Sequence, residues 1–281
     1  VANKVETARS AIASTFGGQQ EQLCDLEAAA RGRTIANRIE HLCELERDEV
    51  ECVRSFAMSE PRIHQSGSEI VDQRERSPDP MFISSGWACR VRILSGGRRQ
   101  IIGFLLPGDP IGLRGAAEPD APTSIGAITQ VESIDARGLL AQVERSNRYP
   151  GLERAIQRAD AQEKEFLMNQ VARLGSMTPA ERLEDLLREL KWRLRQVRLA
   201  DERQFQMPLS DRDFAATLNL HRGELRSAMK KLRRLHGFRV RRNVAQLAEL
   251  GGETGRQDGF FRPPSISRAP GLSPLPRIIS S

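Results

Sequence analysis

The stretch from Leu209 to Leu235 constrains the fold most, because its pattern predicts two short helices joined by a tight turn. Its sequence is LSDRDFAATLNLHRGELRSAMKKLRRL. Ser210 is a good N-cap for the first helix, and Asn219 lies at the turn, where the residue must tolerate a positive φ angle. The apolar residues recur at helical spacing: they are Phe214, Ala215 and Leu218 in the first helix, and Leu225, Met229 and Leu232 in the second.

Basic charge is concentrated on the second of these helices and just beyond it. From His221 to Arg242 there are nine Lys and Arg residues and one acid, Glu224, which gives a net charge of +8. The whole chain carries +6, so all other residues together sum to −2. A basic helix after a turn is suited to the major groove of double-stranded DNA, where its flanks meet phosphates. Periodicity alone also allows a helical hairpin with a solvated basic face.

Length and composition predict a two-domain protein without a membrane span. The chain has 281 residues, and 39% of them are hydrophobic. It contains no run of about 18 apolar residues, and its first residues lack the apolar core of a signal peptide. We therefore expect a cytoplasmic protein.

The cysteines fit a reducing compartment rather than a metal site. Cys24, Cys43, Cys52 and Cys89 are separated by 18, 8 and 36 residues, so no closely spaced pair exists. Iron–sulfur and zinc sites normally include such pairs. We expect free thiols, mostly buried, with a redox-sensing role left open, and no metal or cofactor.

The first half of the chain predicts helices followed by a small β-domain. Residues 1–20 are small and polar and predict a flexible arm, whereas residues 23–58 show helical periodicity. From about residue 70 to 134, short apolar runs between turns predict an antiparallel barrel or sandwich. The turn Ser95-Gly96-Gly97 predicts a hairpin between two of these strands.

A long helix is expected from about residue 149 to 175. Its apolar residues recur at spacings of three, four or eight, which favours a homodimer seam, although packing on the same chain is the alternative. The expected dimerisation residues are Leu152, Ile156, Ala159, Leu167, Val171 and Leu174.

The region after this helix predicts a second helix and a basic wing around the helix pair. Thr178 and Pro179 are suited to the cap and first position of the second helix. The alternating residues Phe238–Arg242 predict one strand of the wing, and Val244–Leu250 a final helical turn or two. From Gly251 the chain is rich in Gly, Pro, Ser and Arg, and predicts a disordered tail.

Three stretches together resemble the Crp/Fnr family of bacterial transcription regulators. They are SGWACRVRILSGGRRQIIGFLLPGDPIGL (85–113), MTPAERLEDLLRELKWRL (177–194) and LSDRDFAATLNLHRGELRSAMKKLRRLHG (209–237). The resemblance covers roughly residues 21–250 and implies an α+β fold. Its parts are a cyclic-nucleotide-binding-like β-roll or jelly roll acting as sensor (21–145), a dimerisation helix (146–176) and a winged helix-turn-helix (177–250). The flexible arm (1–20) and the disordered tail (251–281), which composition predicts, lie outside it.

The family's effector chemistry transfers poorly to this chain. Cyclic-nucleotide binders of the family hold the ribose with a Gly-Glu pair, which falls here on Gly108 and Asp109. The Arg and the following Ser or Thr that hold the cyclic phosphate fall on Ala121 and Pro122, neither of which is a cation. The phosphate would be desolvated with little compensation, so we expect no tight cyclic-nucleotide binding. The closely spaced N-terminal cysteines of the cluster-binding members are also missing.

The resemblance implies a sequence-specific regulator that binds a palindromic promoter site as a homodimer through the helix Arg222–Leu235. The base-reading positions of the family fall near Gly223 or Glu224 and on Ser227. The flanking Arg222 and Arg226 could read guanine instead. The wider set of expected DNA contacts is His221, Arg222, Glu224, Arg226, Ser227, Lys230, Lys231, Arg233, Arg234, Arg241 and Arg242.

Two other function classes can be weighed against a regulator. A degenerate sensor or interaction protein, whose β-roll binds a ligand or partner without specific DNA binding, is the alternative. An enzyme is not expected, because the four histidines are scattered and the sequence contains no nucleophile elbow, P-loop or H-E-x-x-H motif. An activator would additionally contact RNA polymerase, and no motif in the sequence defines such a surface.

Overall fold

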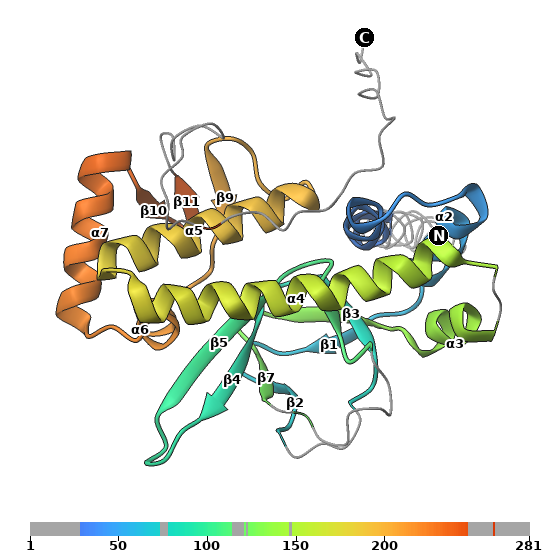
Figure 1. Cartoon of the computed structure of the whole chain (residues 1–281), viewed down its shortest axis with the longest axis horizontal. Coiled ribbons are helices and arrows are strands. Elements are labelled where there is room, and N and C mark those ends of the chain that lie inside the picture. Colours follow the sequence, from blue (N-terminus) through green and yellow to red (C-terminus); the bar gives the residue numbers. More distant parts are fainter. Residues whose placement is uncertain are drawn as a thin grey trace, which may run out of the picture.

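The computed structural model describes residues 29–73, 78–113, 121, 123–145, 148–246 and 261 (Figure 1). The predicted arm (1–20) lies outside these residues, and so does the predicted tail (251–281) except for Phe261. The described part combines helices with three antiparallel sheets, so the predicted α+β class is confirmed.

Two helices precede the β-domain. The first is described over residues 29–42, and α2 runs from Arg47 to Ala57. Their apolar residues recur at helical spacing, and they are buried in one cluster with the start of the long helix α4. The buried members from these two helices are Ile35, Ile39, Leu42, Val53 and Ala57, and Cys43, directly after the first helix, joins them.

The β-domain consists of two four-stranded antiparallel sheets, as the short apolar runs predict. The strand orders are β1-β8-β3-β6 and β2-β7-β4-β5. The expected hairpin is formed by β4 and β5, with Ile93 opposite Arg99 across the turn. The strands are β1 (Arg62–His64), β2 (Glu69–Val71), β3 (Met81–Ser85), β4 (Ala88–Ile93), β5 (Arg99–Leu105), β6 (Pro110–Ile111), β7 (Ser124–Ala127) and β8 (Val131–Asp135).

After α3 (Arg137–Arg145), the chain enters the long helix α4 (Pro150–Ser176). Pro150 lies in its first turn, as expected. The Glu49 carboxylate of α2 accepts hydrogen bonds from the first-turn amides of Gly151, at 2.6 Å, and Leu152, at 3.1 Å. A carboxylate there is favourable because it satisfies free N–H groups and opposes the helix dipole.

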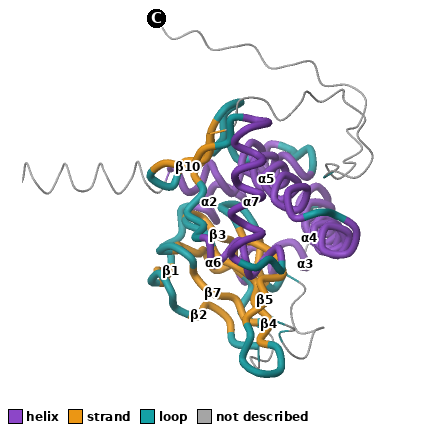
Figure 2. The backbone as a smooth tube through the Cα atoms, turned by 90° about the vertical axis from the view of Figure 1, so that its left-hand side faces the viewer, coloured by secondary structure: helices purple, strands orange, loops and turns teal. Residues whose placement is uncertain are grey.

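The helix α5 (Pro179–Gln196) turns back and lies antiparallel beside α4, above the sheet β2-β7-β4-β5 (Figures 1 and 2). Thr178 and Glu181 form a capping box at its start, with Pro179 in the first turn, as their order in the sequence predicts. α5 therefore connects the long helix to the C-terminal elements.

The C-terminal elements are two helices and a three-stranded sheet. Helix α6 (Asp211–Leu218) and helix α7 (Arg222–His236) are joined by a tight turn, and the sheet has the order β10-β11-β9. The expectation of a helical turn at Val244–Leu250 is wrong for its described part, because Val244–Gln246 forms strand β11. Its partners are β9 (Gln204–Gln206) and β10 (Arg239–Arg241).

Candidate functional site

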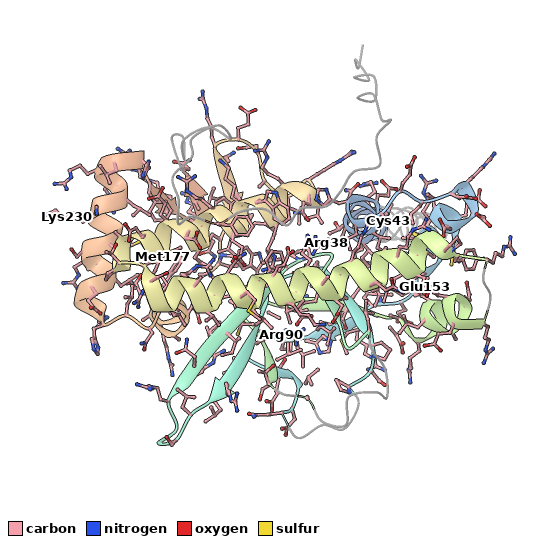
Figure 3. All side chains as sticks on the ribbon, in the orientation of Figure 1. Arg38, Cys43, Arg90, Glu153, Met177 and Lys230 are labelled. Atoms are coloured by element: carbon pink, nitrogen blue, oxygen red, sulfur yellow. The ribbon has the colours of Figure 1, made fainter. Side chains whose placement is uncertain are left out.

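The outer face of α7 carries most of the residues that are expected to contact DNA. Leu225, Ala228 and Leu232 are buried on the inner face. Arg222, Arg226 and Lys230 follow each other at intervals of four on the exposed side. Figure 3 shows α7 at one end of the molecule with Lys230 pointing outward. All eleven expected contact residues, from His221 to Arg242, are exposed.

The turn before α7 has the geometry that its sequence predicts. The side-chain oxygen of Ser210 accepts a hydrogen bond from the Asp213 amide and so caps α6. Asn219 adopts the left-handed conformation with φ of 50°. At the start of α7, the His221 amide donates to the Glu224 carboxylate at 2.8 Å, so Glu224 stabilises the helix end.

A hairpin of basic residues follows α7. Strands β10 and β11 are joined by Arg242 and Asn243, whose φ angles are 48° and 61°. Two consecutive positive φ values are typical of the tight turns that match the twist of a hairpin. Arg241, the last residue of β10, and Arg242 in the turn are both exposed.

The helix pair is fixed to the rest of the molecule through the last carbonyls of α6. Gln100 of β5 donates to the Ala216 carbonyl at 2.6 Å, and Gln170 of α4 donates to the Thr217 carbonyl at 2.7 Å. These groups have no partner within α6, so donors from outside satisfy them. No local sequence pattern predicts these contacts, because each joins elements far apart in the chain.

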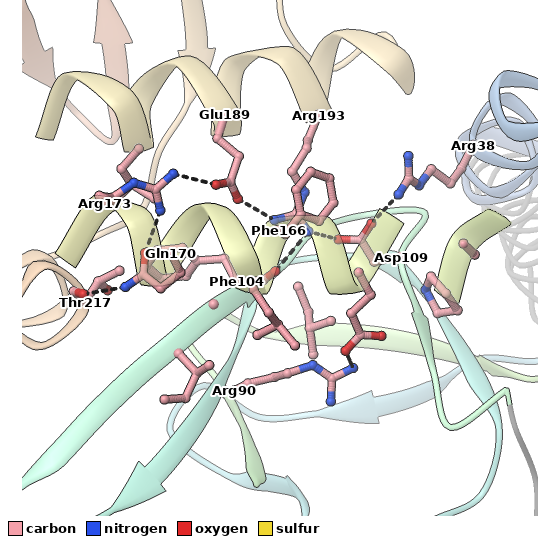
Figure 4. A pocket seen from close by; sticks show the side chains of 18 residues that line it. Arg38, Arg90, Phe104, Asp109, Phe166, Gln170, Arg173, Glu189, Arg193 and Thr217 are labelled. Carbon is pink, nitrogen blue, oxygen red and sulfur yellow. Dashed lines mark hydrogen bonds and ion pairs between the residues drawn. The ribbon is translucent and has the colours of Figure 1, made fainter. Parts of the chain in front are cut away.

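A continuous chain of buried ion pairs lies between α4, α5 and the β-domain (Figure 4). Arg173 of α4 donates to Asp185 at 2.8 Å and to Glu189 at 2.6 Å. Arg193 of α5 contacts Glu189 at 3.3 Å and also pairs with Asp109. Each side chain that takes part in these ion pairs is at most 7% exposed. In the sequence these ion pairs are visible only as the recurrence of Asp185, Glu189 and Arg193 at intervals of four along one face of α5, which by itself predicts no buried partner.

Arg38 closes the chain of ion pairs at the β-domain. Its guanidinium lies 3.4 Å from Asp109 and also donates to the Gln196 side chain. Burial lowers the pKa of Arg38 to about 10, a value at which the side chain is still charged at neutral pH. The series of ion pairs contains three cations and three acids, so its charges sum to zero. The cations are Arg38, Arg173 and Arg193, and the acids are Asp109, Asp185 and Glu189.

The predicted effector residues are not brought together in one pocket: of the described ones, only Asp109 lines the pocket drawn in Figure 4, whereas Gly108 and Ala121 do not. Asp109 is 5% exposed, and its carboxylate is bound to Arg38, Arg193 and the Leu106 amide. Gly108 has a φ angle of 92°, and a Cβ atom there would lie 2.8 Å from the Cβ of Arg38.

Ala121, the other described member of the expected pocket, is 6% exposed in the apolar core of the β-domain. It is clustered there with residues such as Ile83 and Ile125. Pro122 lies outside the described residues. The turn 107–109 thus packs against α5 and the first helix, which assigns Asp109 a structural role.

The expected dimerisation residues fall into two groups. Leu152 and Ala159 are 1% and 5% exposed in the core of the same chain, so their assignment to an exposed seam is wrong. Apolar periodicity does not reveal which surface covers a helix, and here the first helix and α3 cover this part. Val171 is 69% exposed, whereas Ile156, Leu167 and Leu174 are half-buried.

The three described cysteines are free, as expected, and Cys24 lies outside the described residues. Cys43 and Cys89 are buried, whereas Cys52 is half-buried. Burial raises the pKa of the Cys89 thiol to about 11, although Arg99 lies 3.1 Å from its sulfur and favours the thiolate. Within the described part of the chain, no three His, Cys, Asp or Glu residues are grouped so as to hold a metal ion.

We expect Cys89 to resist alkylation in the folded protein. At pH 8 a thiol with this pKa is ionised to only about one part in a thousand, and only the thiolate reacts. Iodoacetamide followed by mass spectrometry should modify Cys52 before Cys89, and Cys89 only after unfolding. Labelling of Cys89 as fast as Cys52 in the native protein would contradict this expectation.

No protein-family model matches the chain, and no curated protein matches it. Among solved structures, FixK2 from Bradyrhizobium japonicum matches with 23% identity and a TM-score of 0.57 over 68% of this chain and 92% of its own. The chain has the Crp/Fnr fold.

Two further structures with this fold support the assignment. TTHA1359, a CRP/FNR family transcriptional regulator from Thermus thermophilus, matches with 17% identity and a TM-score of 0.51, over 68% of this chain and 94% of its own. The c-di-GMP-responsive regulator CLP from Xanthomonas campestris matches with 16% identity and a TM-score of 0.51, over 73% of this chain and 100% of its own. Among the described helices, none combines the length and the hydropathy that a membrane span requires.

Proposed function

We propose that the chain is a sequence-specific DNA-binding transcription regulator of the Crp/Fnr type, acting as a homodimer on a palindromic promoter site. The observation that carries this proposal is the exposed basic face of α7, which projects from one end of the molecule. The resemblance in sequence and the Crp/Fnr fold support it.

In this proposal, α6, α7 and the sheet β10-β11-β9 act as a winged helix-turn-helix. Helix α7 enters the major groove, where Arg222 and Arg226 contact base edges or nearby phosphates. The cations further along α7 and in the wing contact the phosphate backbone, which sets orientation and affinity. Those expected phosphate contacts are Lys230, Lys231, Arg233, Arg234, Arg241 and Arg242.

The proposed dimer uses the exposed side of α4. Met168 and Val171 are each 69% exposed and lie three residues apart on this helix, so they share one face. Large apolar side chains exposed together often mark an interface. Two copies related by a two-fold axis would present their α7 helices to major grooves one helical turn apart, about 34 Å, which predicts a palindromic site.

We expect Val171→Glu to shift the protein from dimer to monomer. A carboxylate in the middle of an apolar seam would be desolvated without a partner, which weakens association. Light scattering coupled to size exclusion measures the molar mass. The matched control is Ile63→Glu, because Ile63 is 58% exposed on β1, away from α4. If both variants stay dimeric, or the unmodified chain is monomeric, the assignment of this seam is wrong.

The β-domain would act as the sensor, but without the cyclic-nucleotide chemistry of the family. We expect isothermal calorimetry to detect no micromolar binding of cyclic AMP or cyclic GMP, because the Asp109 carboxylate is already bound to two arginines. An effector would act by shifting the population of DNA-competent dimers. If the protein is an activator, a further surface would contact RNA polymerase.

Binding to labelled duplex DNA at two salt concentrations tests the proposal against its alternative. A regulator should bind and retain specific affinity at the higher salt, whereas contacts to phosphate alone weaken steeply for every sequence. A sensor or interaction protein without specific DNA binding would show no sequence preference. The exposed basic face of α7 favours the first outcome.

A further inference from the structure

Phe261 lies against the hairpin of α4 and α5, far along the chain from both helices. Its ring centroid is 6.4 Å from that of Phe166 on α4, and the two planes are nearly parallel at 29°. The same ring lies 5.5 Å from Trp192 on α5, tilted by 58°. Both arrangements are within the range in which aromatic rings attract each other. Phe261 therefore contacts the two long helices at once.

The two receiving rings are also held by side chains other than Phe261. The Arg193 guanidinium lies 4.5 Å from the centroid of Phe166, a cation–π contact. His41 of the first helix meets Trp192 edge to face at 5.9 Å. Arg193 is in turn fixed by Asp109 and Glu189 in the buried chain of ion pairs. Because these side chains already fix the two rings, little free energy is needed to order them when a third ring binds.

The backbone of Phe261 adds a polar contact to the aromatic ones. Its amide donates a hydrogen bond to the Oδ1 atom of Asp185, whose Oδ2 atom accepts from Arg173. Asp185 is 1% exposed. Burial raises the pKa of this carboxyl, and both Arg173 and the Phe261 amide oppose that shift. The segment at Phe261 thus completes the hydrogen bonds of a buried carboxylate.

We propose that the C-terminal segment docks through Phe261 on the aromatic site formed by Phe166 and Trp192, and clamps α4 to α5. The occupant is this chain's own tail. Phe260 and Phe261 are the only aromatic residues after Phe238. Fifteen steps along the chain separate Gln246 of β11 from Phe261, a length that can span at most about 50 Å. Because α5 leads into α6 and α7, the clamp fixes the start of the C-terminal elements relative to α4.

Trp192 gives a direct readout of this docking. The chain has two tryptophans, and the other, Trp87, is 5% exposed in the β-domain. Labelling the full chain with 5-fluorotryptophan therefore gives two ¹⁹F signals, of which only that of Trp192 should respond. We expect Phe261→Ala to change the ¹⁹F chemical shift of Trp192 and to increase the difference between its values in H₂O and D₂O, which reports exposure to solvent. Phe260→Ala should leave both quantities unchanged. The Trp87 signal shows in each variant whether the β-domain is still folded.

A peptide experiment separates docking from any general effect of the substitution. In a chain ending at residue 250, the Trp192 signal should resemble that of Phe261→Ala, and a peptide of residues 255–268 should restore it. The Phe261→Ala peptide should bind at least about tenfold more weakly, since two aromatic contacts are lost. The proposal is overturned if neither Phe261→Ala nor truncation changes the Trp192 signal, if Phe260→Ala has the same effect as Phe261→Ala, or if the peptide does not bind.

The oligomeric arrangement is tested separately by dilution. Docking within one chain predicts a Trp192 signal that is independent of protein concentration. A signal that moves on dilution towards that of Phe261→Ala would mean that the tail of another copy occupies the site, which contradicts docking in cis. Neither measurement depends on DNA, so failure here leaves the proposed function untouched.

Discussion

Replacing Arg173 with methionine should lower the free energy of unfolding by about 3–5 kcal/mol, the range measured when one partner of a buried ion pair is removed. The Arg173 side chain is 2% exposed and is the cation shared by Asp185 and Glu189. Without it, two carboxylates face each other in a site with little water. Urea unfolding at pH 8 measures the loss.

The pH dependence of this variant distinguishes lost ion pairing from lost packing. Without the cation, the folded-state pKa of the Asp185 carboxyl, which burial already raises and Arg173 opposes, should rise further above the unfolded value of about 4. A raised folded pKa favours folding at low pH, and this contribution is lost as the pH rises through the folded pKa. The difference in free energy of unfolding between Arg173→Met and the unmodified chain should therefore be smaller at pH 5 than at pH 8. Adding Asp185→Asn and Glu189→Gln should recover stability at pH 8.

The control for this prediction is Arg47→Met. Arg47 pairs with Glu51 at 3.7 Å, but the two side chains are 95% and 67% exposed. Exposed pairs at this spacing contribute about 0.3–0.5 kcal/mol. A loss for Arg173→Met no larger than that for Arg47→Met would show that the buried chain of ion pairs does not hold α4, α5 and the β-domain together.

Replacing both Arg222 and Arg226 with alanine should abolish specific DNA binding while leaving the fold intact. Both side chains are exposed and project from the outer face of α7. Each well-placed arginine contributes about 1–3 kcal/mol of discrimination between bases, so the pair accounts for about 30-fold or more. Fluorescence anisotropy with the selected site and a scrambled site measures affinity and specificity together.

Arg241→Ala provides the comparison within the same interface. As a phosphate contact in the wing, Arg241 should weaken binding to the selected and scrambled sites alike, and reduce the salt dependence by about one counterion. Arg47→Ala, on α2, should change neither affinity. If Arg241→Ala alters base preference, or the double variant retains it, the roles assigned to α7 and the wing are wrong.

The starts and ends of the C-terminal helices could be predicted from sequence because local chemistry determines them. Thr178 with Pro179 begins α5, Ser210 begins α6, and Asn219 takes the left-handed conformation between α6 and α7. Each of these signals involves residues within one helical turn. The exposed face of α7 could be predicted for the same reason, since its apolar and basic residues alternate with the helical period.

The remaining features depend on contacts between distant segments. The apolar residues of α4 predict a buried face, but the sequence does not say whether the first helix or a second copy covers it, and Leu152 and Ala159 are covered by the same chain. Strand β11 has three residues, too few for a period to be visible. The position of Asp109 in the sequence suggests a ligand contact, whereas its partners Arg38 and Arg193 lie on two separate helices.

The most direct test of sequence-specific binding by a dimer is recovery of bound fragments from a random duplex library by the full chain, repeated at two salt concentrations. We predict a shared palindrome whose half-sites are centred about 10 base pairs apart and which persists at the higher salt. Fragments without a common sequence, lost together as salt increases, would contradict the account and show that the basic face of α7 contacts phosphates without reading bases.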